Sequence, residues 1–507
     1  MIQAPALNFG TLLPIGSIWL GALLVLLGEV YLSRRQSFLG RPVTPVWIGT
    51  VLAAVSTFFL VLTLAMSLQA FLSGNTVAFD PANPMIQLDR FSNFAVVVVV
   101  LGALLACWLS VSYLVELRIN HGEYYALLLL ATSGMVLTVI AVDLVALFLG
   151  IELMSIPIYV LAGFQRRDLK SNESALKYFL VGSFASAILL YGMALIYGVT
   201  GATDFAGIRA QLEPTNLLGL AGVGLVIVGF AFKISSVPFH QWTPDVYEGA
   251  PTAVTAYMSV TVKAAAFLAL LRLVMLALPS VGMRLEPLFW ALSALTMIVG
   301  NVMAVIQDNV KRMLAYSSIA HAGYLLIGLV TATPESYGAV VFYLLAYVFM
   351  NVGAFAVMSA LASGGRECDR MEDFAGLARE RPGMAALMTL FMLSLAGIPG
   401  TGGFWAKFAL FSAAVNAGVV KLTILAVLTS LVSVYYYLRL PVVMYMRERS
   451  AESGPWGALS TGELAVLAAC AAGVLFLGLF PNNVPFAEGF HVLDWARASA
   501  AQLFASR

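Results

Sequence analysis

The stretch FSNFAVVVVVLGALLACWLSVSYLVEL, residues 91–117, has no charged side chain before Glu116. A helix rises about 1.5 Å per residue, so a helix over this stretch is about 40 Å long, longer than the ~30 Å hydrocarbon layer of a bilayer. So long an apolar run is typical of a membrane span. The stretch therefore predicts a transmembrane helix.

Similar apolar stretches recur along the whole chain. We predict about 14 spans from these stretches. The spans are predicted to be helices, because the alternating ten-residue strands of a β-barrel are absent. The predicted spans cover residues 11–32, 45–73, 91–117, 122–140, 142–164, 175–198, 218–240, 251–277, 286–306, 311–332, 337–363, 383–413, 417–440 and 461–481. The predicted fold class is an all-α polytopic membrane protein. The first span is long enough to remain in the membrane, so we do not expect it to be a cleaved signal peptide.

The composition of the 507 residues agrees with this fold class. Apolar residues make up 61% of the chain and charged residues 10%, whereas soluble domains carry about 25% charged residues. A soluble enzyme and a disordered or fibrous chain are thereby excluded. The 27 basic and 26 acidic residues nearly cancel, so no net charge attracts nucleic acid.

The cysteines and histidines predict no cofactor in this chain. Cys107, Cys368 and Cys470 are far apart and form no CxxC pair, which excludes an evident disulfide framework, zinc knuckle or iron–sulfur site. Four histidines leave little room for bis-histidine haem ligation. We therefore expect neither a metal nor a cofactor held by this chain.

The loops predict the orientation. Most of the 27 Lys and Arg residues fall in one alternating set of loops, which the positive-inside rule places in the cytoplasm. Both termini then lie on the outer side, and this requires an even number of spans.

Two predicted spans are interrupted by similar breaks. FKISSVPFHQW, residues 232–242, and GIPGTGGFWAK, residues 397–407, combine proline with small or polar residues. Proline removes a backbone donor, so a break in a bilayer persists only where protein or a wet cavity satisfies the backbone. Broken helices at matching places in two halves indicate internal repeats with the transported ion near the breaks. Each repeat is predicted to cover five helices.

Ionisable residues inside the spans are the candidate site. A charge at mid-bilayer costs about 2.5–3.5 kcal/mol, so several such positions indicate a function. We propose a proton relay in which lysines linked by water exchange protons as neighbouring charges change. The candidate residues are Glu152, Lys177, Lys233, Lys263 and Lys407, with His321 as a possible member.

Structural roles are the alternative for each of these residues. Lys177 could extend to the cytoplasmic interface or form a structural ion pair with Glu152. Lys233 and Lys263 could form structural pairs inside the bundle, and glycines near Lys407 leave its depth open. His321 could be a packing residue. Three further groups are predicted to be peripheral: Asp143 at the interface, the mixed-charge cluster 366–373 on a solvated face, and the tail 482–507 as an amphipathic surface segment.

Several long motifs, in this order, resemble a known family. They are DLVALFLGIELMSIPIYVLAG (143–163), RRDLKSNESALKYFLVGSFASAILLYG (166–192), FKISSVPFHQWTPDVYEGAPTAVTAYMSVTVKAAAF (232–267), DNVKRMLAYSSIAHAGY (308–324) and LAGIPGTGGFWAKF (395–408). This pattern resembles the antiporter-like membrane subunits of the proton-pumping NADH–quinone oxidoreductase, respiratory complex I. The resemblance covers roughly residues 90–440.

The resemblance implies two inverted five-helix repeats and a set of residue roles. The family's glutamate–lysine pair falls on Glu152 and Lys177, the central lysine on Lys233, the connecting lysine on Lys263 and the exit residue on Lys407. One sibling subunit carries glutamate at the last position, so the lysine here separates this chain from that sibling. The implied units are residues 1–121 with three N-terminal helices, 122–277 as the first repeat, 286–440 as the second, and 441–507 with the last helix and the tail.

The resemblance also implies the surroundings of the chain. Its partners would be other membrane subunits of complex I, including sibling antiporter-like subunits, and membrane lipids, with no nucleic acid. FMN, iron–sulfur clusters and quinone are expected in other subunits, and the location is the bacterial inner membrane. Two other functions remain open from the sequence: a cation/proton antiporter, alone or in a complex, and a scaffold that transports nothing.

Overall fold

A computed structural model describes residues 7–34, 37–38, 41–42, 44–363, 366–449, 456–482 and 491–505. Almost all of its regular structure is helical. The α-helices are α1 (Leu13–Ser33), α2 (Pro45–Ser73), α3 (Arg90–Glu116), α4 (Gly122–Ile140), α5 (Leu144–Ala162), α6 (Leu169–Thr200), α7 (Phe205–Gln211), α8 (Leu217–Lys233), α9 (Trp242–Gly249), α10 (Thr252–Leu276), α11 (Gly282–Val305), α12 (Val310–Thr331), α13 (Pro334–Leu361), α14 (Leu377–Glu380), α15 (Pro382–Ala396), α16 (Gly402–Asn416), α17 (Val420–Met446), α18 (Thr461–Leu479) and α19 (Val492–Ala505).

Short elements join these helices. Three 3-10 turns, η1 (Phe9–Leu12), η2 (Pro279–Val281) and η3 (Met371–Phe374), precede or follow longer helices. Two antiparallel pairs of two-residue strands, β1 (Ser37–Phe38) with β2 (Arg41–Pro42) and β3 (Val77–Ala78) with β4 (Gln87–Leu88), close loops on either side of α2.

Twelve helices in the described part of the chain are long and apolar enough to cross a membrane. Two shorter apolar helices, α8 and α15, lie where interruptions are predicted. α8 ends at Lys233, where Ser235 has a left-handed φ of 62°, and α15 ends before Gly397 with a φ of 86°. The chain is thus an all-helical membrane protein with many spans, and its helices coincide with every predicted apolar stretch.

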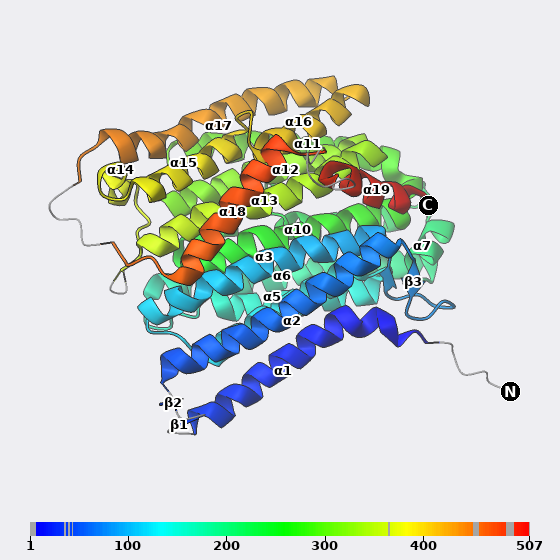
Figure 1. Cartoon of the computed structure of the whole chain (residues 1–507). Coiled ribbons are helices and arrows are strands. Elements are labelled where there is room, and N and C mark those ends of the chain that lie inside the picture. The colour runs from blue at the N-terminus through cyan, green and yellow to red at the C-terminus, as the bar shows by residue number, and fades with distance from the viewer. Residues whose placement is uncertain are drawn as a thin grey trace.

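The helices lie side by side, with α1 and α2 at one edge of the bundle and α17 at the other (Figure 1). Burial within the chain distinguishes the centre from the edges. In the apolar stretch of α12 every residue is buried, and in those of α10 and α13 94% of the residues are buried, whereas in those of α1 and α17 39% are. The edge helices therefore leave apolar surface for lipid or neighbouring subunits.

Two charged groups near helix ends are buried within the protein. Arg272 lies within α10 and pairs with buried Asp89 at 2.7 Å. Asp143 is 3% exposed, and its side chain caps the start of α5 by accepting from the backbone N–H groups of Val145 and Ala146. Both carboxylates are tolerated because charge-assisted bonds replace water.

The tail forms a helix over its described part. In α19 the apolar residues Val492, Leu493, Ala496 and Leu503 face inward, against α13 and α3. The amphipathic pattern predicted for 482–507 is therefore present in α19, and this helix covers the ends of two central helices. Residues 483–490 and 506–507 lie outside the described residues.

Candidate functional site

The first part of the candidate site lies where α8 ends against α5. Lys233, the last residue of α8, is 3% exposed and donates to the hydroxyls of Ser155 at 2.7 Å and Tyr159 at 3.4 Å. Glu152 occupies the same face of α5 one turn before Ser155, and its carboxylate accepts from Ser186 of α6 at 2.5 Å. The structure thus brings a buried ammonium and a carboxylate to one helix face.

Lys177 does not pair with Glu152. Helix α6 begins at Leu169, earlier than predicted, so Lys177 lies in its third turn. The ammonium contacts Glu173, one turn earlier, at 2.6 Å and Asp245 of α9 at 2.8 Å. The predicted pair is therefore not formed in this structure, because two other carboxylates lie closer to this lysine.

Lys263 lies at the middle of α10 and reaches α12. It is 2% exposed and donates to the backbone carbonyl of Ser318 at 2.6 Å and to the Ser318 hydroxyl. Both acceptors are neutral oxygens. The lysine predicted to be the connecting one thus joins α10 to α12 directly.

His321 is buried in α12 and held by two tyrosines. Its Nδ1 lies 2.6 Å from the hydroxyl of Tyr343 in α13, and its Nε2 lies 3.0 Å from that of Tyr437 in α17. Tyr437 also bonds the hydroxyl of Ser317 at 2.5 Å. A ring with polar partners on both nitrogens can receive a proton on one side and release it on the other.

Lys407 lies just after the second break, one turn into α16. It is 6% exposed and donates to the carbonyl of Ala396, the last residue of α15, at 3.0 Å and to Ser430 of α17 at 2.9 Å. Its ammonium also lies 5.3 Å from the centre of the Tyr324 ring of α12. The charge therefore stabilises the carbonyl end of the interrupted helix, where a positive charge is favoured.

One face of α12 joins these groups. This face carries polar residues three or four positions apart, namely Ser317, Ser318, His321 and Tyr324. Ser318 contacts Lys263 at one end of the face, and the ring of Tyr324 lies beneath Lys407 at the other. The sequence prediction missed the serines and tyrosines because hydroxyl groups are common in membrane helices and cost little free energy to bury there. A run of hydroxyls at this spacing around His321 was the available signal.

A buried ion pair at the loop ends was also missed. Lys311, at the start of a predicted span, is fully buried and contacts the carbonyl of Ala250 at 2.7 Å and Glu367 at 2.6 Å. Glu367 also accepts from Tyr113 and Thr252. Burial raises the pKa of Glu367, but the adjacent Lys311 outweighs this and holds the pKa below its usual value. The cluster 366–373 is therefore partly a buried joint and not a wholly solvated face.

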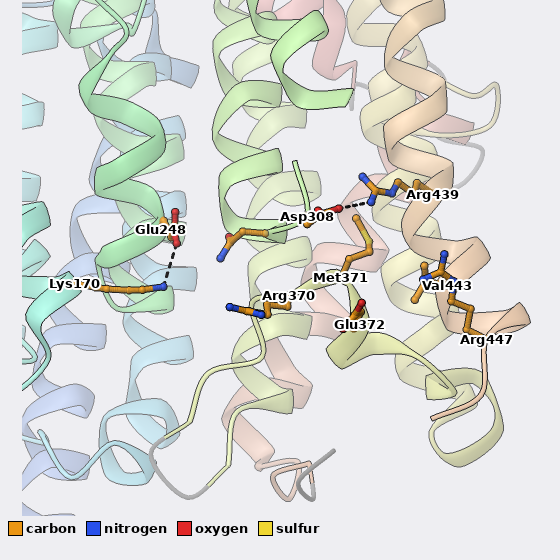
Figure 2. A pocket seen from close by; sticks show the side chains of 10 residues that line it. Lys170, Glu248, Asp308, Arg370, Met371, Glu372, Arg439, Val443 and Arg447 are labelled. Carbon is orange, nitrogen blue, oxygen red and sulfur yellow. Dashed lines mark hydrogen bonds and ion pairs between the residues drawn. The ribbon is translucent and has the colours of Figure 1, made fainter. Parts of the chain in front are cut away.

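A polar cavity opens among the loop ends. Its volume is about 440 Å³, and it lies between α6 and α9 on one side and α17 on the other (Figure 2). Lys170 pairs with Glu248 at 3.1 Å across one wall, and Arg439 pairs with Asp308 on the other. A second polar cavity of about 180 Å³ shares Lys170 and Glu248 and reaches Lys177 and Asp245. Polar space thus extends from the loop ends to Lys177.

Known proteins with this arrangement identify the family. A family model described as NADH:quinone oxidoreductase/Mrp antiporter, transmembrane, matches residues 141–433. NADH-quinone oxidoreductase subunit N of Trichlorobacter lovleyi is 49% identical over 401 residues, which are 78% of this chain and 82% of that one. The chain belongs to the subunit N family of NADH-quinone oxidoreductases. Subunit N 1 of Herpetosiphon aurantiacus is 41% identical and matches 94% of this chain and 95% of its own length.

Solved structures agree with this subunit N assignment. A chain of respiratory complex I from Thermus thermophilus, solved with bound aureothin, is 35% identical with a TM-score of 0.74, covering 91% of this chain and 97% of that chain. A chain of the Mrp complex from a Dietzia species has a TM-score of 0.84 and 23% identity, with 98% of each chain covered. The second likeness shows a shared fold.

Proposed function

We propose that this subunit N translocates protons in the membrane part of a complex I, through a relay of lysines, while electrons pass from NADH to quinone in other subunits. The observation that carries the proposal is the polar face of α12. This face contacts Lys263 near one end and Lys407 near the other, and it includes His321. Successive polar residues along it are no more than about one helical turn apart. A structural core helix has no need of such a face.

The proposed topology has fourteen crossings. We count α8 with the segment after it, and α15 with α16, as one broken span each. Residues 122–277 and 286–440 are then two inverted repeats between an N-terminal unit, 1–121, and a C-terminal unit, 441–507. Both termini lie outside, in the orientation that the positive loops favour.

Protons enter, in this proposal, through the polar cavities beside Lys170 and Lys177. Glu152 and Lys233 form the first storage site. When Glu152 is ionised it favours the charged form of Lys233, and when it is neutralised Lys233 releases its proton. Ser155 and Tyr159 fix the ammonium between these events.

The second half carries the proton from Lys263 to Lys407 along α12. Water joins the hydroxyl groups where direct bonds are lacking. Lys407, whose ammonium donates to a carbonyl and a hydroxyl, both neutral, is the release site. The chain is proposed to hold no redox centre, and FMN, iron–sulfur clusters and quinone belong to other subunits. Sibling antiporter-like subunits and membrane lipids are the proposed neighbours in the bacterial inner membrane.

The relay is tested by Lys233→Ala in the purified complex reconstituted into vesicles. The expected result is assembled complex with most of the proton pumping per electron lost, because Lys233 is the ammonium that shares this face of α5 with Glu152. Lys421→Ala, at an exposed site at the start of α17, is the matched control. Normal proton-to-electron stoichiometry in the Lys233 variant would falsify the relay.

The assembly is tested separately by isolating the tagged chain from native membranes in mild detergent. A large complex with flavin and iron–sulfur absorbance that transfers electrons from NADH to quinone is expected. A small colourless complex that exchanges sodium or potassium for protons without NADH identifies a cation/proton antiporter instead, the alternative that the shared fold with the Mrp chain leaves open.

A further inference from the structure

A group of three potential metal ligands lies outside the relay, at the end of α1. Glu29 of α1 meets His121 and Glu123 at the start of α4, and their ligand atoms all lie within 4.8 Å of one another. Glu29 is half-buried, and the other two side chains are exposed. Two carboxylates and an imidazole are thus gathered from helices that are far apart in the sequence.

The imidazole is not used by the helix that it precedes. His121 occupies the N-cap position of α4, where a side chain commonly accepts a hydrogen bond from the helix, yet it makes no such bond. One ligand atom of its ring instead lies within 4.8 Å of a carboxylate oxygen of Glu29 and of Glu123.

The two carboxylates lie together without a compensating cation. Among the described residues, no Lys or Arg forms an ion pair with Glu29 or Glu123, although like charges at this range repel. The carboxylate of Glu29 also packs against Gly122, between the other two ligands, so closely that a Cβ there would lie 2.4 Å from its oxygen. The arrangement holds negative charge in a fixed place, which a divalent cation would neutralise.

We propose that Glu29, His121 and Glu123 bind a divalent transition-metal ion of the zinc class, with water completing the coordination. Zinc binds nitrogen and carboxylate oxygen at about 2.0–2.2 Å, so two ligands of one ion lie no more than about 4.4 Å apart. The exposed side chains need to close by only a fraction of an ångström. The ion clasps the end of α1 to the start of α4, two helices that already pack together.

The test uses the full-length chain in nanodiscs, stripped with a chelator and dialysed against Zn²⁺. One Zn²⁺ per chain is expected, and His121→Asn and Glu29→Gln should each weaken binding by about ten-fold or more, since even outer-shell changes cost ~10–100-fold. Glu116→Gln, an exposed carboxylate at the end of α3, is the matched control and should bind as the parent does. Co²⁺ in place of Zn²⁺ should give a visible absorption band that the His121 variant lacks.

Equal Zn²⁺ affinity in the parent chain and the His121→Asn variant overturns the site. So does an equal loss in the Glu116 control, which would show non-specific attraction to surface charge. The relay residues are untouched by these changes, so either result leaves the proposed proton translocation standing.

Discussion

The two interrupted helices place their lysines in different surroundings. Lys233 lies before the first break and donates to side chains of α5, on a face that also carries Glu152. Lys407 lies after the second break and donates to the backbone of Ala396 and to Ser430. The first lysine therefore has a charged neighbour that can change state, whereas the second has neutral partners, one of which is fixed by the backbone. The electrostatic surroundings of Lys233 can therefore change with the charge on Glu152, whereas those of Lys407 stay the same.

The largest effect is expected from Lys407→Met, which removes the buried ammonium at the second break. Proton pumping per electron in vesicles should fall to near the background level, while Lys407→Arg, which keeps the charge at the end of α15, should retain part of it. Lys421→Met is the matched control at an exposed position. Full pumping by the Met variant would mean that the second site takes no part.

Glu152→Gln should follow in size, because it removes the charge that distinguishes the first site. Lys233 then loses its ionised neighbour, and pumping should fall about ten-fold or more if the pair is worth at least ~1.4 kcal/mol. Glu335→Gln, an exposed carboxylate in the first turn of α13, should pump normally. An unchanged proton-to-electron ratio would make the two lysine sites equivalent.

A smaller effect is expected from removing one hydroxyl at each site. Ser155→Ala deletes the nearest acceptor of Lys233, and a hydrogen bond to a charged group contributes ~1.5–3 kcal/mol. Ser430→Ala leaves Lys407 with the carbonyl of Ala396, which no substitution removes. Pumping should therefore fall further in the Ser155 variant. The reverse order would contradict the distinction between side-chain and backbone partners.

The smallest effect is expected from Asp245→Asn. Asp245 holds Lys177 at 2.8 Å and Arg312 at 2.6 Å, but Glu173 also contacts Lys177, so one carboxylate remains. Pumping should fall about two-fold, in keeping with the small free energy of partly exposed ion pairs. The double variant with Glu173→Gln frees Lys177 to approach Glu152, and should alter pumping more than the single changes together. Additive effects would argue against a movable Lys177.

Much of the fold follows from local sequence. Apolar runs of helical length fix where the helices form, and proline, glycine and polar residues fix the ends at Lys233 and Ala396. The depth of Lys263 and His321 was also predictable, because counting residues along a helix measures depth. Each of these features depends on residues that are neighbours in the chain.

The partners of the charged residues were not predictable in the same way. Lys177 contacts Asp245 and not Glu152, and Lys311 is buried against Glu367. In each case the partner comes from an element many residues away, and several carboxylates compete for one lysine. Which carboxylate forms the ion pair depends on the spacing and rotation of packed helices, and hydropathy does not encode either.

By itself, the sequence determined that this protein is a helical membrane protein with ionisable residues at mid-helix, because the free energy of burying apolar and charged groups in lipid depends on local composition. Only the tertiary structure decided which polar groups meet: the hydroxyls of Tyr343 and Tyr437 around His321, and the α12 face from Lys263 to Lys407. The physical reason is that hydrogen bonds act over about 3 Å, so their pairing is set by how helices distant in the sequence pack against one another.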